Sequence, residues 1–121
     1  MTERVPPDGF HSVTPRIVVR DVAVAVEFLL TVFDASGESR SGGPAEIRIG
    51  DSLVMVSPAG VRDEFPAFLY VYVQDADIVY ARAVAAGAET LEAPRDTPYG
   101  DRRAMVRDAA GNVFQIAHRA H

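Results

Sequence analysis

Val18-Val19-Arg20-Asp21 closes one apolar stretch of this chain, and Val71-Tyr72-Val73-Gln74-Asp75 closes a second one 54 positions later. In both places an extended apolar segment stops at an aspartate, and a segment with helical periodicity follows. Aspartate is a favoured N-cap, because its short carboxylate accepts hydrogen bonds from the free amides of the first helical turn. The recurrence of this pattern predicts two copies of one supersecondary unit.

The first copy is predicted over residues 13–57. Residues 13–20 form its first strand, and residues 21–33 form an apolar helix whose only charge after the capping Asp21 is Glu27. Three glycines within residues 36–44 indicate a short, irregular strand in a loop. Residues 45–49 and 53–56, with a turn at Gly50-Asp51 between them, predict a hairpin. Residues 1–12 are interpreted as a lead-in, and residues 58–66, which contain Pro58, Gly60 and Pro66, as the linker to the second copy.

The second copy, over residues 67–118, repeats the order of the first. We predict a strand over residues 67–73, a helix over residues 76–86 followed by Gly87, and further strands over residues 90–93, 102–107 and 113–118. Residues 94–100 are rich in turn formers. Each half is therefore β-α-β-β-β. Neither half can bury both faces of its sheet alone, so the two should pack into one domain over residues 13–121.

Composition limits the classes of function. The chain has 121 residues, and 48% of them are apolar, which suffices for one globular core. The net charge of −5, with both signs interspersed, argues against nucleic-acid or anionic-membrane partners, which require a basic face. No apolar run approaches the ~20 residues that span a bilayer, and no signal-peptide core is present, so we expect a cytoplasmic protein. The chain has no cysteine for disulfide or thiolate chemistry.

Further short motifs occur in order along the chain, beside the two strand ends quoted above. They are Asp8-Gly9-Phe10-His11-Ser12-Val13-Thr14-Pro15, Glu46-Ile47-Arg48-Ile49-Gly50-Asp51-Ser52, Ala81-Arg82-Ala83-Val84-Ala85-Ala86-Gly87-Ala88, and Tyr99-Gly100-Asp101-Arg102 with Asp108-x-x-Gly111-Asn112. In this order they resemble the vicinal oxygen chelate superfamily, which contains glyoxalase I, the bleomycin-resistance proteins and ring-cleaving dioxygenases. Within this superfamily, the chain most resembles the small PhnB-like members.

The resemblance implies an α+β fold of two βαβββ modules, in which curled mixed sheets enclose a cavity and the helices lie outside. It also implies a homodimer. Residue alternation agrees independently with this fold, because side chains alternate between the two faces of a strand. Leu69, Val71 and Val73 suit a face covered by a helix, whereas Phe68, Tyr70 and Tyr72 suit the cavity.

Enzymes of this superfamily hold a divalent metal with His, Glu or Gln side chains from four strands. In this chain the resemblance places those positions at Thr14, at Met55 or Val54, at Phe68 and at Gln115. Only Gln115 is a plausible ligand, because Thr, Met, Val and Phe side chains supply none of the imidazole, carboxylate or amide oxygen donors that these enzymes use. We therefore expect neither a metal nor another cofactor. The three histidines, His11, His118 and His121, are interpreted as solvent-exposed or capping residues.

A cavity in this fold would be lined by aromatic and charged side chains, which suit an organic ligand. The expected lining consists of Arg16, Glu46, Arg48, Met55, Phe68, Tyr70, Tyr72, Arg103 and Gln115, and it is bordered by the turn at Tyr99. In the alternative interpretation Tyr70 and Tyr72 pack against each other and the arginines pair with Glu46.

Three functions remain open from the sequence. The first is metal-independent binding or sequestration of a small aromatic or anionic drug or metabolite by a homodimer. The second is an isomerase- or lyase-type enzyme in which Glu46 acts as base or Arg48 as electrophilic partner. The third is a metalloenzyme, of the dioxygenase type for example, with ligands such as Glu46, Gln115 and His11. The sequence also leaves open whether the modules pair within one chain or swap between chains.

Overall fold

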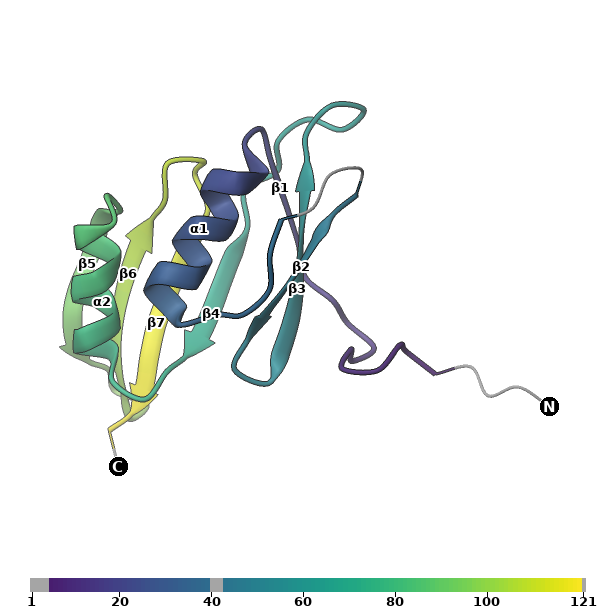
Figure 1. The fold of residues 1–121 in the computed structure, drawn as a ribbon. Helices are drawn as coiled ribbons and strands as arrows, with labels where there is room; N and C mark the ends of the chain where they lie inside the picture. Colours follow the sequence, from purple (N-terminus) through teal and green to yellow (C-terminus); the bar gives the residue numbers. More distant parts are fainter. Residues whose placement is uncertain (1–4, 40–42, 121) are drawn as a thin grey trace.

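The computed structural model describes residues 5–39 and 43–120. Within these ranges the two copies form separate sheets, and both helices lie on one side of the sheets (Figure 1). The first copy contains β1 (Arg16–Val19), α1 (Val22–Phe33), β2 (Ala45–Ile49) and β3 (Ser52–Pro58). The second contains β4 (Phe68–Tyr72), α2 (Ala76–Ala85), β5 (Glu89–Asp96), β6 (Asp101–Arg107) and β7 (Val113–Arg119).

The two sheets repeat one topology. The strand order is β1-β3-β2 in the first sheet and β4-β7-β6-β5 in the second. The first strand of each module lies parallel to its last strand, whereas the remaining pairs are antiparallel. The predicted α+β class, with two related modules and mixed sheets, is confirmed. Within the single chain the two sheets do not close on each other.

Local capping explains where the helices begin. The Asp21 carboxylate accepts a hydrogen bond from the Val24 amide at 3.1 Å, and the Asp75 carboxylate accepts one from the Ile78 amide at 3.2 Å. Both predicted N-caps are thus confirmed. After α2, Gly87 adopts a φ of 98°, a left-handed conformation that glycine accepts without steric cost.

Helix α1 packs against both sheets. It contacts β2 and β3 of its own module, where Ile47 and Val56 are fully buried. On the other side, the rings of Phe28 and Phe33 contact Phe114 of β7, with centroids 5.7 and 5.4 Å apart. The two modules therefore share one hydrophobic core around α1. Because this core lies on the helix side of both sheets, the opposite face of each sheet is open.

Three segments differ from the sequence predictions. The strand expected within residues 36–44 is reduced to a bridge between Ser36 and Arg48, while residues 40–42 lie outside the described residues. Strand β5 continues through Pro94 to Asp96, into the segment expected to turn. An edge strand with register shifts, as β5 is, tolerates a proline because one row of its amides needs no partner.

Neither helix is long and apolar enough to cross a membrane, as far as the described residues go.

The linker is the third segment. Instead of only connecting the modules, it folds back on β1: the Phe65 amide donates to the Val18 carbonyl at 3.2 Å, and the Ala59 amide donates to the Val19 carbonyl at 2.7 Å. A bridge joins Val18 and Phe65. The linker therefore pairs with the free edge of β1, and its residues line a cavity together with Arg16 and Val18.

Candidate functional site

The open faces of the two sheets divide the predicted site residues into two groups. The tyrosine face, on the second sheet, consists of Phe68, Tyr70, Tyr72, Tyr99, Asp101, Arg103, Gln115 and Arg119. The arginine face, on the first sheet and the docked linker, consists of Arg16, Val18, Glu46, Arg48, Met55, Arg62 and Phe65. The two cavities that contain Arg16 hold no residue of the tyrosine face. The residues expected to line one cavity thus occupy two surfaces of the chain.

Asp101 is the centre of the tyrosine face. Its side chain is fully buried, with 0% of its surface exposed, at the first residue of β6. One carboxylate oxygen, Oδ2, accepts hydrogen bonds from the hydroxyls of Tyr70 at 2.6 Å and Tyr72 at 2.8 Å. The other, Oδ1, accepts a hydrogen bond from Arg119 Nη1 at 2.8 Å. The carboxylate is therefore enclosed by donors and has a cationic partner.

These contacts change the acidity of the groups involved. Hydrogen bonds from Tyr70, Tyr72 and Arg119 lower the pKa of Asp101 below its ordinary value, and they outweigh the opposing effect of burial. Burial and the hydrogen bond to Asp101 raise the pKa of Tyr70. Near neutral pH the site therefore holds a carboxylate and a neutral phenol.

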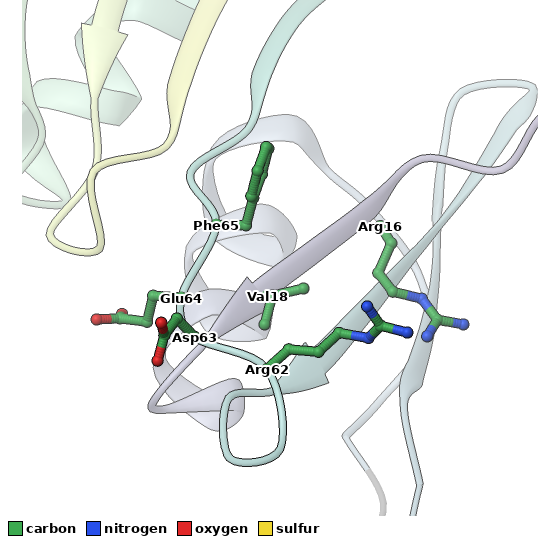
Figure 2. Close-up of a pocket in the computed structure, with 6 residues that line it drawn as sticks. All are labelled: Arg16, Val18, Arg62, Asp63, Glu64 and Phe65. Atoms are coloured by element: carbon green, nitrogen blue, oxygen red, sulfur yellow. The ribbon is translucent and has the colours of Figure 1, made fainter.

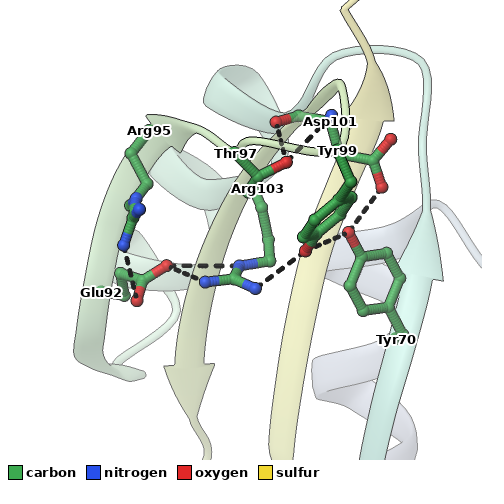
Figure 3. Close-up of polar contacts among 7 residues, drawn as sticks. All are labelled: Tyr70, Glu92, Arg95, Thr97, Tyr99, Asp101 and Arg103. Atoms are coloured by element: carbon green, nitrogen blue, oxygen red, sulfur yellow. Dashed lines mark hydrogen bonds and ion pairs between the residues drawn. The ribbon is translucent and has the colours of Figure 1, made fainter.

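A second ion pair extends the network towards the sheet edge (Figure 3). Glu92 Oε1 accepts hydrogen bonds from Arg103 Nε and Nη2 at 3.2 and 2.6 Å, and Arg103 Nη1 donates to the Tyr99 hydroxyl at 2.9 Å. The Tyr99 and Tyr70 hydroxyl oxygens are 3.3 Å apart. Because Tyr70 has one hydrogen and gives it to Asp101, we infer that Tyr99 donates to Tyr70. Glu92, Arg103, Tyr99, Tyr70 and Asp101 thus form one continuous chain.

The polar network leaves aromatic rings as the outer surface of this face. Phe68 is 68% exposed and Tyr72 59% exposed, although both rings are apolar over most of their area. The rings of Tyr70 and Tyr72 pack at 5.3 Å with a tilt of 55°, as aromatic pairs prefer. The two carboxylates, Asp101 and Glu92, are each neutralised by an arginine. A ligand that approaches this surface would therefore meet aromatic rings in fixed orientations, because both carboxylates are already paired with arginines.

Sequence reasoning missed three members of the network, namely Glu92, Asp101 and Arg119. Asp101 could have been identified from the sequence, because it follows Tyr99-Gly100 and lies on the same strand face as Arg103. Glu92 and Arg119 could not have been identified in this way, because their partners are set by the pairing between strands. Arg103, predicted to contact a ligand, is held by Glu92. The packing of Tyr70 on Tyr72 follows the alternative interpretation, and both hydroxyls also bond to Asp101.

The arginine face has a different character. Arg16 Nη2 lies 3.4 Å from the sulfur of Met55, which is a weak acceptor. Met55 faces this side, whereas Val54 is 4% exposed and faces the core, so the strand register is resolved in favour of Met55. Glu46 and Arg48, the candidate catalytic pair, alternate with buried residues along β2 and point to the same side. The guanidinium of Arg48 lies against Gly9 of the lead-in.

The donor set does not fit the metal site of the fold. Thr14, Met55 and Phe68 offer no imidazole or carboxylate, and Glu46 and Gln115 lie on different sheets. Among the described residues no group of three or more His, Cys, Asp or Glu side chains is placed to hold a metal ion. His118 Nδ1 accepts a hydrogen bond from the Ala76 amide at 2.8 Å and so caps α2, His11 is exposed, and His121 lies outside the described residues.

Comparison with known proteins agrees with the fold. Residues 9–116 match the family described as the Glyoxalase/Bleomycin resistance protein/Dioxygenase superfamily. Uncharacterised proteins of Mycobacterium bovis and Mycobacterium tuberculosis strain H37Rv are each 31% identical over 123 residues, which cover 87% of this chain and 81% and 72% of theirs. The chain therefore belongs to the glyoxalase/bleomycin resistance protein/dioxygenase superfamily.

Solved structures of similar shape share this fold. TioX from Micromonospora sp. ML1 superposes with a TM-score of 0.75 at 25% identity, over 92% of this chain and 98% of that one. A glyoxalase/bleomycin resistance protein/dioxygenase family enzyme from Burkholderia phytofirmans superposes with a TM-score of 0.69 at 23% identity, over 86% and 94%. At this identity the second likeness concerns the fold alone.

Proposed function

We propose that this protein is a metal-independent member of the superfamily that binds a small, planar organic molecule against its tyrosine face. One observation carries the proposal: Phe68 and Tyr72 are exposed while the hydrogen-bond network fixes the ring orientations beside them. The donor set at the metal positions supports a metal-independent mode.

The energetics favour a flat aromatic ligand. Covering apolar ring surface stabilises a complex by about 25 cal/mol per Å² removed from water. Offset or tilted contact between rings adds about 0.5–1.5 kcal/mol per pair. Because the hydrogen bonds of Tyr70 and Tyr72 to Asp101 already hold their rings, binding costs little ordering entropy.

We further propose that the protein is a homodimer in which a second copy covers the open faces. The shared core around α1 lies on the helix side of both sheets, so the tyrosine and arginine faces point away from it. A second copy that places its arginine face opposite the tyrosine face of the first would form an enclosed site from two chains. This corresponds to modules that pair across chains.

The binding proposal is tested with two probes of equal shape, neutral 2-naphthamide and anionic 2-naphthoate. We expect at least one of them to give a saturable thermal shift, because ligand binding stabilises the native state. Phe68→Ala should weaken that binding about 5- to 10-fold, which is the loss of about one aromatic contact. Ile78→Ala on α2, which removes a similarly exposed apolar side chain, serves as the matched control and should leave binding unchanged.

Native mass spectrometry before and after addition of Zn²⁺, Ni²⁺ or Fe²⁺ tests the remaining parts. A dimer without stoichiometric metal is the expected result. One bound metal per chain would contradict the metal-independent mode, and a monomer at micromolar concentration would contradict the assembly. If neither probe shifts the melting temperature of the wild-type protein, the binding function itself is wrong.

A further inference from the structure

The arginines of the chain fall into two classes. All 12 basic Lys or Arg residues are arginine. Six of those in the described ranges lie within ion-pair distance of a carboxylate; they are Arg20, Arg95, Arg102, Arg103, Arg107 and Arg119. The other four in the described ranges, Arg48, Arg82, Arg16 and Arg62, have no such partner within the part of the chain that the structure describes, and of these Arg16 and Arg62 line the same cavity. In a chain of net charge −5 this is notable, because carboxylates outnumber arginines.

These two guanidiniums share one cavity of about 470 Å³ on the arginine face. Figure 2 shows Arg16 from β1 and Arg62 from the docked linker extending towards the same side of the opening. Two acidic residues, Asp63 and Glu64, also line this cavity, but their carboxylates extend to the opposite side (Figure 2). Glu64 is bound to Arg20 at 2.8 Å. The end of the cavity next to Arg16 is therefore cationic.

The remaining wall of the cavity is apolar. Val18 of β1 and Phe65 of the linker complete the lining, and Phe65 is 74% exposed. The bridge between the backbones of Val18 and Phe65 fixes this wall. The guanidiniums of Arg16 and Arg62 and the ring of Phe65 thus line the same cavity, and the docked linker sets the spacing between them.

A second feature lies next to Arg16. The Ser57 hydroxyl, on β3 opposite Val18, is buried and has no hydrogen-bond partner in the described structure. Ser57 and Arg16 line a common neighbouring cavity. Buried hydroxyls are normally satisfied, so an unpaired one beside a free cation indicates a missing polar partner.

We propose that, in the two-chain site described above, Arg16 and Arg62 of the copy that faces the tyrosine face form the anion-recognition part and select an organic carboxylate with a flat apolar body. The carboxylate would pair with the two guanidiniums, for which planar, bidentate geometry is favourable. Its apolar body would lie on Val18 and Phe65, and the Ser57 hydroxyl would donate to a carboxylate oxygen. This inference rests on the proposed binding function and names its ligand class.

The test compares 2-naphthoate with 2-naphthamide by isothermal titration calorimetry. We expect the wild-type protein to bind the carboxylate at least about 10-fold more tightly than the amide, as for a charge-assisted hydrogen bond. The double variant Arg16→Gln/Arg62→Gln should bind both probes equally. Arg82→Gln serves as the matched control, because Arg82 is another exposed arginine without an ion-pair partner among the described residues, but it lies on α2.

Ionic strength provides an independent measurement on the unmodified protein. Exposed charges are screened by salt, so raising NaCl from about 50 to about 500 mM should weaken binding of the carboxylate and leave that of the amide nearly unchanged. Equal binding of both probes by the wild type, or a salt-insensitive preference that survives in the double variant, overturns the proposal.

Two failures can be told apart. If the amide binds, Phe68→Ala weakens it, and the carboxylate binds no better, the proposed function stands and the carboxylate selectivity is wrong. If neither probe binds the wild-type protein, the proposed function and this inference both fall. Circular dichroism of the double variant distinguishes lost recognition from lost folding.

Discussion

The tyrosine and arginine faces occupy corresponding sides of two related sheets, but they differ in how their charged side chains are paired. On the tyrosine face Asp101 and Glu92 each have an arginine, and the phenols complete the remaining bonds. On the arginine face Arg16 and Arg62 have no ion-pair partner among the described residues. Charged groups that are paired with each other stabilise the fold, whereas guanidiniums without an ion-pair partner can still pair with the carboxylate of a ligand.

The difference follows from one strand. In the second module β5 extends the sheet and supplies Glu92 to Arg103 of β6. The corresponding segment of the first module makes only the bridge from Ser36 to Arg48, and the described sheet has three strands instead of four. As far as the described residues go, the first sheet therefore lacks the strand that would carry counter-charges.

The largest effect is expected at Asp101. Its pKa is lowered in the folded state, so its ionised form stabilises the fold above the ordinary pKa of aspartate, and this contribution is lost as the pH falls through the lowered value. In urea unfolding, Asp101→Asn should be clearly less stable than wild type at about pH 6, and the gap should narrow at about pH 3 and below.

Asp96→Asn is the control for this series, because Asp96 is exposed and its pair with Arg102 at 3.5 Å lies at the surface. Surface pairs contribute about 0–1 kcal/mol, so this variant should stay close to wild type. A gap between Asp101→Asn and wild type that does not depend on pH would mean that the pKa of Asp101 is the same in the folded and the unfolded protein.

An intermediate effect is expected at Tyr70. Tyr70→Phe removes the 2.6 Å hydrogen bond to Asp101 and should lower the free energy of unfolding by about 1–2 kcal/mol. Tyr80→Phe removes a hydroxyl that contacts Thr90 at 2.9 Å on the surface and should cost less than about 1 kcal/mol. If urea unfolding shows that both variants lose the same free energy of unfolding, then the hydrogen bond of Tyr70 to Asp101 stabilises the protein no more than an ordinary surface hydrogen bond.

The smallest effect is expected on the arginine face. Arg16→Gln/Arg62→Gln breaks no ion pair within the described residues, so the free energy of unfolding should change by no more than about 0.5 kcal/mol. The same urea measurement applies. A loss of several kcal/mol would show that these arginines support the fold, and the contrast between the two faces would then be wrong.

Much of the fold was readable from local chemistry. Asp21 and Asp75 cap helices, and the alternation in β2 and β4 separates core from open face, because both depend on a few neighbouring residues. Strand β5 was predicted too short, because its tolerance for Pro94 depends on its edge position. The linker was read as a connection, although its contact with Val18 makes it part of a cavity.

By itself, then, the sequence determined two related modules with mixed sheets, their helix caps, the face of each strand and the poor fit of the donor set to a metal, whereas the fourth strand expected in the first module is only a bridge in the described structure. The tertiary structure decided which polar side chains meet. Asp101 gathers Tyr70, Tyr72 and Arg119 from β4 and β7, whereas Arg16 finds Arg62 and no carboxylate partner among the described residues. Caps and periodicity are local, but charge pairing depends on strand order and on where a linker docks, and neither is encoded in any short stretch of chain.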